Sequence, residues 1–151
     1  MPPRLAMKND LTKDIVVRRF TLDEATAMLP LVRSIVTDIC GVFRDVTSRR
    51  VELHRLLRNK HRGAGRIYDD EMAESRADLQ AEYDQVFRYR EELEELGILL
   101  RQPEEGLVEF PTYLNDQEAF YSWQLDEPSI SHYRMASEQP TVRWQLGALQ
   151  N

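Results

Sequence analysis

The sequence predicts an α+β protein, in which a long antiparallel helical hairpin is followed by a small antiparallel β-sheet. Three observations support this fold class. Apolar residues recur at three- and four-residue spacing over two long stretches, 21–60 and 69–96. A short glycine-containing segment separates these stretches. From residue 98 onward, apolar residues alternate with polar ones, as in strands. Helices first and strands afterwards are typical of an α+β domain.

The composition indicates one folded, soluble domain over residues 1–151, with residues 1–14 frayed. The chain is 42% hydrophobic and 30% charged. No apolar run approaches the roughly 20 residues that cross a bilayer, and the N-terminus lacks the apolar core of a secretory signal. The single cysteine, Cys40, excludes an internal disulfide framework. We therefore expect a cytoplasmic protein without a membrane contact. The net charge of −6 argues against nucleic acid as a partner.

The helix predicted over 21–60 has a clear start and one irregularity. Thr21 as N-cap and Glu24 at N3 form a capping box, and residues 15–20 read as an extended lead-in. Pro30 lies inside the helix, where it has no N–H to donate and crowds the preceding turn. We therefore expect the first helix to be kinked near Pro30.

This helix carries more apolar surface than one neighbouring helix needs. Its two adjacent seams are Met28, Val32, Ile35, Ile39, Val42, Val46, Leu53 and Leu56, and Leu29, Val32, Val36, Ile39, Phe43, Val46, Leu53 and Leu57. A double seam makes a wide stripe and predicts more than one packing partner. An ordinary bundle helix and a helix shared with a second subunit both fit this pattern, and we expect a homodimer through the helices.

The helix predicted over 69–96 should fold back along the first one. Asp69 or Asp70 caps its start, and Gly97 ends it. Eleven acidic and three basic residues between 69 and 95 face a first helix with a net charge of +2. We expect Arg49 and Arg50 to lie near Asp78 and Glu82. The expected apolar pairs are Leu57 with Met72, Val46 with Tyr83, Phe43 with Val86, and Val36 with Leu93.

The sheet is predicted over residues 98–146. Its expected extended segments are 98–101, 107–110, 118–125, 129–135 and 142–146. We expect Pro111 to stop the second of these segments, and Asn115 with Asp116 to form a hairpin-like turn.

Two stretches of the chain are similar to a known family. The first is FTLDEATAMLP at 20–30, and the second is GLVEFP at 106–111 with the later Glu118, Trp123, Leu125 and Glu127. They resemble an uncharacterised bacterial family, domain of unknown function 2203, over residues 20–134. The resemblance implies a fold and a bacterial setting but no reaction. The chain departs from the family pattern at Tyr133–Arg134, where the family has a Trp-His pair.

Three groups of side chains are weak candidates for a site. Glu118 and Glu127 are candidate catalytic carboxylates, with Glu109 and His132 nearby in the predicted sheet. The candidate ligand-binding residues are Trp123, Tyr133 and Arg134. The candidate anion-binding residues near the hairpin tip are Arg58, Lys60, Arg62 and Arg66.

Each candidate group also has a structural explanation, as solvated charges, helix-end cations or a packing layer. No tight metal-ligand motif occurs, so we assign neither a metal ligand nor a cofactor. The leading hypothesis is an uncharacterised, non-enzymatic interaction or scaffold protein that self-associates through its hairpin and binds an unidentified protein partner. The alternative is a small enzyme or a ligand- or metal-binding protein with its site on the C-terminal sheet.

Overall fold

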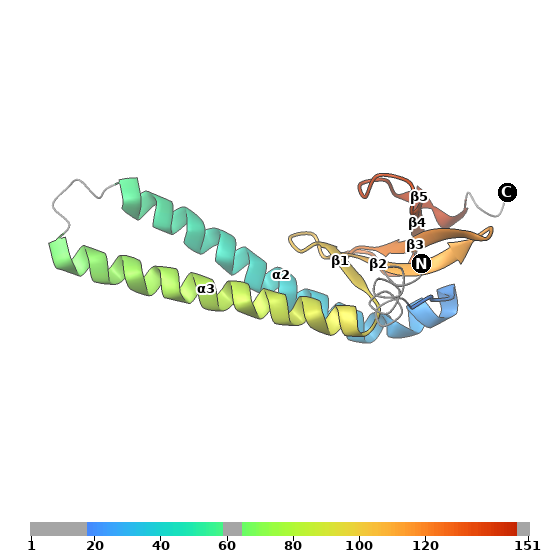
Figure 1. The fold of residues 1–151 in the computed structure, drawn as a ribbon, viewed down its shortest axis with the longest axis horizontal. Helices are drawn as coiled ribbons and strands as arrows, with labels where there is room; N and C mark the ends of the chain where they lie inside the picture. The colour runs from blue at the N-terminus through green and yellow to red at the C-terminus, as the bar shows by residue number, and fades with distance from the viewer. Residues whose placement is uncertain (1–17, 59–64, 148–151) are drawn as a thin grey trace, which may run out of the picture.

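The computed structural model describes residues 18–58 and 65–147, which form two long helices and a five-stranded sheet. The elements are α2 (Leu22–Arg58), α3 (Gly65–Glu95), β1 (Leu99–Gln102), β2 (Leu107–Leu114), β3 (Gln117–Trp123), β4 (His132–Met135) and β5 (Trp144–Gln145). Figure 1 shows the sheet above one end of the helical hairpin, whose other end projects away as an arm. The predicted α+β class is confirmed.

The start of α2 is tied both to its own first turn and to the sheet. The Glu24 N–H donates to Thr21 Oγ1 at 3.0 Å, and the Thr21 N–H donates to Glu24 Oε1 at 2.8 Å. The predicted capping box is therefore present. Just before it, the Phe20 N–H donates to the Pro111 carbonyl at 2.8 Å, and the Thr112 hydroxyl donates to the Phe20 carbonyl at 2.6 Å. These bonds attach the start of α2 to β2 and fix the direction of the helix relative to the sheet.

Pro30 lies inside α2, which continues through it as one helix. In Figure 1 the first turns of α2, drawn in blue, lie at an angle to the rest of the helix. This change of direction agrees with the predicted kink, because proline removes one backbone bond and crowds the preceding turn.

One helix of the described chain is long and apolar enough to cross a bilayer, which the sequence analysis did not anticipate. An 18-residue stretch of α2 has a mean hydropathy of 1.4. The core helix of a soluble protein meets the same criterion, and α2 contributes eight buried residues to this fold. Because 28% of that stretch is buried, the core accounts for part of the apolar content of α2.

Ion pairs connect α3 with α2, which runs antiparallel to it. Arg49 Nη1 lies 3.4 Å from Asp78 Oδ2, and Arg49 Nε lies 2.6 Å from Glu82 Oε1. These contacts confirm the position predicted for Arg49. Arg50 instead donates to the Tyr83 hydroxyl at 3.2 Å. Closer to the sheet, Val36 and Leu93 are fully buried in one apolar cluster, as the predicted helix pairing requires.

The sheet is an antiparallel meander in the order β1-β2-β3-β4-β5. Asn115 and Asp116, with φ of 53° and 63°, form the turn between β2 and β3. Two consecutive positive φ values match the twist of a tight hairpin, so the predicted turn is confirmed. Gly97, with φ of 86°, separates α3 from β1, as expected.

The prediction that Pro111 stops the second strand is wrong, because β2 continues to Leu114. The Pro111 carbonyl accepts from the Phe20 N–H, on the side of β2 away from β3. In an extended strand the nitrogen of a residue points to the same side as its carbonyl. The missing N–H of Pro111 therefore costs the β2–β3 ladder no hydrogen bond.

The sheet has an apolar inner face, which packs on α2, and a polar outer face. Val108, Phe110 and Trp123 on the inner face are fully buried in the same cluster as Val32 and Ile39 of α2. The double seam of α2 thus has two partners within one chain near the sheet, namely α3 and the sheet itself. This arrangement explains a large part of the wide apolar stripe without a second subunit.

Candidate functional site

The outer face of the sheet is built around a buried carboxylate, Glu109 of β2, which is 1% exposed. Arg134 of β4 reaches across β3 and donates to it twice, through Nε to Oε2 at 2.7 Å and through Nη2 to Oε1 at 2.8 Å. Arg101 Nε also donates to Glu109 Oε1, at 2.6 Å. Two-pronged guanidinium–carboxylate pairing combines charge with fixed geometry, so this network locks β2 to β4.

Arg134 is fully engaged within the protein. Its third nitrogen, Nη1, donates to the Glu138 carbonyl at 2.6 Å, and its Cζ lies 4.7 Å from the centre of the Phe120 ring. The hydrogen bonds that Arg134 donates to Glu109 raise the pKa of Arg134, although burial opposes them. A guanidinium that is 3% exposed and bonded through all three nitrogens has a structural role and is poorly placed to meet a ligand.

A second ion pair surrounds Glu127, just beyond β3. Arg143 Nη2 lies 2.7 Å from Glu127 Oε1, and Nη1 lies 3.1 Å from Oε2. The Gln124 N–H donates to Oε1 at 2.9 Å, and His132 Nδ1 lies 3.3 Å from Oε2. Burial alone would raise the pKa of Glu127. The bonds from Arg143 and Gln124, with the positive charges of Arg143 and His132, instead hold that pKa below its ordinary value.

Arg143 is the residue that the sequence analysis missed. Besides Glu127, its Nε donates to Ser122 Oγ at 2.8 Å, so it attaches the C-terminal segment to β3. It lies between Val142 and Trp144, and that apolar alternation is a signal that its side chain points to the opposite face. Glu109, in the apolar run of residues 107–110, carried a similar signal, because a buried acid needs a partner.

The structure does not bring the two candidate catalytic carboxylates together. Glu118 lies at the start of β3, and Glu127 lies beyond its end. Glu118 is exposed and pairs with Arg19 at 3.1 Å, whereas Glu127 is held by Arg143. Within residues 18–58 and 65–147, no group of three or more His, Cys, Asp and Glu side chains is placed to hold a metal ion.

The other candidate residues are also dispersed. Trp123 is buried on the inner face, and its indole N–H donates to the Glu127 carbonyl at 3.0 Å. Tyr133 is half-buried on β4, opposite Tyr121 and Trp144. Of the anion-binding candidates, Arg58 is exposed at the end of α2. Lys60 and Arg62, and the side chain of Arg66, lie outside the described residues.

The arm exposes apolar side chains where the sheet stops covering α2. Next to the sheet, Cys40 is buried and its thiol lies 3.2 Å from the Pro103 carbonyl. Thr47, about two turns further along α2, lines a surface hollow with Glu104 of the β1–β2 turn. Val51 follows four residues later on the same side of the helix and is 61% exposed.

Another exposed apolar side chain lies on α3, beside β1. Phe87 is 63% exposed and lines a groove of about 170 Å³ between α3 and β1, opposite Leu100 and Pro103. Leu57, near the end of α2, is 38% exposed. We call Val51, Leu57 and Phe87 the arm surface. Leu57 belongs to one of the two seams of α2, whereas Val51 and Phe87 are exposed apolar side chains outside the seams. These three side chains are the best candidates on the hairpin for a contact with another molecule.

The two helices of the arm differ in charge. Residues 44–58 of α2 contain five arginines and two acidic residues, a net of +3. Residues 69–87 of α3 contain seven acidic residues and one arginine, a net of −6. The arm therefore presents a positive helix beside a negative one.

Residues 18–145 of the chain match a family described as "Uncharacterized conserved protein (DUF2203)". The matched range extends from Arg18, just before α2, to the last residue of β5. Comparisons with curated proteins and with solved structures found no match.

Proposed function

We propose that this chain, which belongs to the family of uncharacterized conserved proteins DUF2203, is a non-enzymatic interaction protein that self-associates through its helical arm. The family description names no reaction and no partner. The observation that carries the proposal is the exposure of two large apolar side chains, Val51 at 61% and Phe87 at 63%, one on each helix of the hairpin.

Isolated exposed apolar residues are common on protein surfaces and need no partner. The arm surface differs because three large apolar side chains, Val51, Leu57 and Phe87, are exposed on the same pair of helices. Between residues 25 and 46 of α2, eight residues are buried by α3 and the sheet. Figure 1 shows that α3 lies along α2 where the hairpin extends beyond the sheet. A second copy of the arm would cover the side of the hairpin that the sheet leaves open.

The charges of the arm favour a second copy over an unrelated occupant. In a two-fold arrangement, the positive α2 segment of one arm would lie along the negative α3 segment of the other, and the reverse pair would form at the same time. The result would be an antiparallel four-helix bundle. The α2 segment of each arm is about 22 Å long at 1.5 Å per residue, or four turns of contact.

The experiment compares the mass in solution of the unmodified chain with that of arm variants. The chain has a mass of 17.8 kDa, so sedimentation equilibrium should report about twice that value at tens of micromolar. Val51→Asp and Phe87→Asp place a charge in the proposed interface, and each should shift the population to monomer. Both side chains are exposed in one chain, so the fold of the monomer should tolerate the changes.

Leu31→Asp is the matched control. Leu31 is on α2 and is 49% exposed, but it lies outside the arm. It should retain the mass of the unmodified chain, and circular dichroism should give equal helix content for all variants. If Leu31→Asp dissociates the dimer as strongly as Val51→Asp, association does not use the arm.

A further inference from the structure

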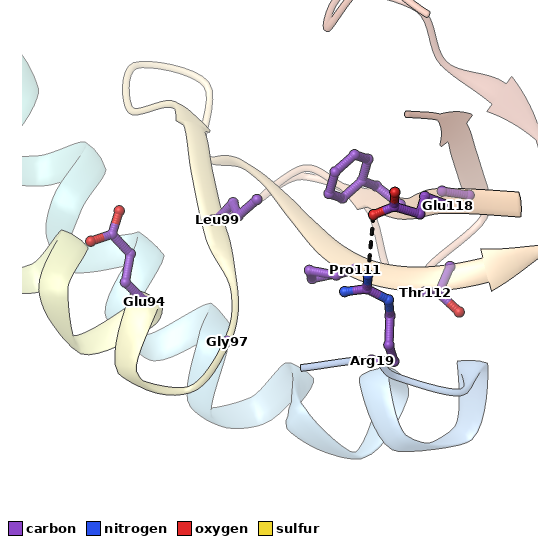
Figure 2. Close-up of a pocket in the computed structure, with 9 residues that line it drawn as sticks. Arg19, Glu94, Gly97, Leu99, Pro111, Thr112 and Glu118 are labelled. Atoms are coloured by element: carbon purple, nitrogen blue, oxygen red, sulfur yellow. Dashed lines mark hydrogen bonds and ion pairs between the residues drawn. The ribbon is translucent and has the colours of Figure 1, made fainter. Parts of the chain in front are cut away.

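We propose that a pocket at the edge of the sheet binds a small amphipathic carboxylic acid, with the carboxylate on Arg19 and the apolar body on Leu99, Pro111 and Phe120. The pocket has a volume of about 360 Å³ and lies between the start of α2, the end of α3 and strands β1 to β3. Figure 2 shows Arg19 and Glu118 facing each other on one side of it, with Leu99 across from them. This site is separate from the arm and does not depend on self-association.

The apolar wall belongs to the outer face of the sheet. Leu99 is paired with Glu109, and Pro111 with Phe120, so these side chains share one face with the buried ion network. The Phe120 ring lies against the guanidinium groups of Arg134 and Arg101, at 4.7 and 5.5 Å from its centre. Phe120 is therefore held in place by charged neighbours, and the pocket has a firm apolar wall.

Arg19 supplies the polar end of the pocket. Its Nη2 lies 3.1 Å from Glu118 Oε1 and 3.3 Å from the Tyr113 hydroxyl, and its Cζ lies 4.6 Å from the centre of the Tyr113 ring. Its Nε is buried without a hydrogen-bond partner in the described structure. A carboxylate from a ligand could accept from the guanidinium in two-pronged geometry, for which arginine is well suited.

The present partner of Arg19 is weakly held. The Glu118 side chain is 67% exposed, and an exposed ion pair contributes little to stability. A ligand carboxylate in the pocket would exchange one carboxylate for another in a less exposed place. Glu94, which also lines the pocket, has its carboxylate directed away from Arg19 in Figure 2 and pairs with Arg90 at 3.4 Å.

The local charge favours an acid over an amine. The pocket lining holds one cation, Arg19, and two carboxylates, Glu94 and Glu118. Glu94 is paired with Arg90, and Arg101 and Arg134 lie against Phe120 and share Glu109. These four arginines and three glutamates give this part of the molecule a net charge of +1, in a chain of net charge −6. The pocket volume is near the lower end of the range for small-molecule sites. A medium-chain fatty acid or a single-ring aromatic acid has the required combination of one anionic end and a short apolar body.

The experiment uses octanoate as the probe, with octan-1-ol and octylammonium as matched compounds of the same chain length. Each is titrated into the ¹⁵N-labelled full chain, and amide resonances are followed. Octanoate should shift the amides of Gly97 and Phe120. Octan-1-ol should bind at least tenfold more weakly, and octylammonium should not compete. Equal affinity for octan-1-ol, tighter binding of octylammonium, or shifts confined to other surfaces would overturn the proposal.

Two variants at the site and one elsewhere separate a binding role of Arg19 from a structural one. Arg19→Gln should weaken octanoate at least tenfold. Glu118→Gln should leave octanoate binding unchanged or strengthen it, because it removes the competing carboxylate. Arg49→Gln, which removes an ion-paired arginine from the hairpin, should have no effect. If Arg19→Gln is poorly folded, Glu118→Gln still decides, because weaker octanoate binding by that variant would contradict the proposed geometry.

Discussion

At the scale of single residues, the most consequential contact joins Glu109 and Arg134. Both side chains are nearly inaccessible, and each supplies the charge that the other needs. A buried charge without a partner is very costly, so this pair couples the central strands of the sheet to β4. Because Arg134 is bonded within the protein in this way, the structure does not favour it as a ligand-binding residue.

Replacing Glu109 by glutamine should destabilise the protein strongly. The change leaves Arg134 and Arg101 without their negative partner, and breaking a buried pair costs about 3–5 kcal/mol. Asp78→Asn, which removes one exposed partner of Arg49, should cost about 0–1 kcal/mol. Urea unfolding measures the free energy of unfolding of both variants. Equal losses would show that the Glu109 network contributes little to stability.

Glu127 should make stability depend on pH in the acid range. Burial alone would raise its pKa, but Arg143, the Gln124 N–H and His132 lower it by a larger amount. The folded-state pKa therefore lies below the ordinary value of 4.5. A depressed folded-state pKa gives stability that is present above the unfolded-state value and is lost as pH falls through the folded-state value. The melting temperature should therefore fall as pH decreases below 4.5.

The variant Glu127→Gln isolates this effect. It should lower the melting temperature at neutral pH and flatten its acid dependence, since the titrating carboxyl is gone. Glu105→Gln, at an exposed position in the β1–β2 turn, should leave the acid slope unchanged. Identical slopes for the unmodified chain and Glu127→Gln would contradict this assignment.

The sequence indicated the important residues of the sheet better than it indicated their partners. Glu118, Glu127, Trp123 and Arg134 all lie in ordered parts of the sheet region. The pairing of Glu109 with Arg134 could not be read from sequence, because 25 positions and one whole strand separate them. Alternation shows which side chains share a face within a strand, but register across strands comes from turns and core packing.

At the scale of elements, local chemistry was sufficient where a signal acts within a few residues. The Thr21–Glu24 capping box, the glycine at the end of α3 and the Asn115–Asp116 turn all follow from side-chain type and short spacing. The sequence did not predict that the sheet is the second packing partner of α2. The apolar stripe on the helix is the same whether a sheet or another subunit packs on it. The continuation of β2 past Pro111 did not follow from sequence either. It depends on whether the missing N–H of Pro111 faces β3 or the opposite edge of the strand, and this requires the strand register.

Gly106 and Gly41 should respond oppositely to alanine. Gly106 has φ of 69°, and an added Cβ would lie 2.7 Å from a Val36 methyl and 2.8 Å from Leu125 Cβ. Gly106→Ala should cost about 1–2 kcal/mol for the left-handed backbone, with an added cost for overpacking. Gly41 lies inside α2 with open space around it, so Gly41→Ala should stabilise by about 0.5–1 kcal/mol.

Thermal and urea unfolding of these two variants measure the difference directly. Gly106 lies where the β1–β2 turn meets α2, so its response reports how closely the sheet packs on the hairpin. If Gly106→Ala leaves the free energy of unfolding unchanged, the β1–β2 turn packs loosely on α2.

At the scale of the whole molecule, the chain consists of a packed base, where the sheet covers one end of the hairpin, and an arm that extends beyond it (Figure 1). All eight buried residues of α2 lie between Ala25 and Val46. The arm has exposed Val51 and Leu57, Phe87 is exposed where the arm meets β1, and the two helices of the arm carry opposite charges. We propose that folding depends on the base and association on the arm, while the Arg19 pocket is a feature of the base.

The central claim is that two arms cover each other, and sedimentation velocity of the unmodified chain over a dilution series tests it most directly. We expect an elongated dimer at tens of micromolar that dissociates toward the 17.8 kDa monomer on dilution. Raised salt should weaken it, because opposite charges meet across the interface. A single monomeric species throughout the series would contradict the claim.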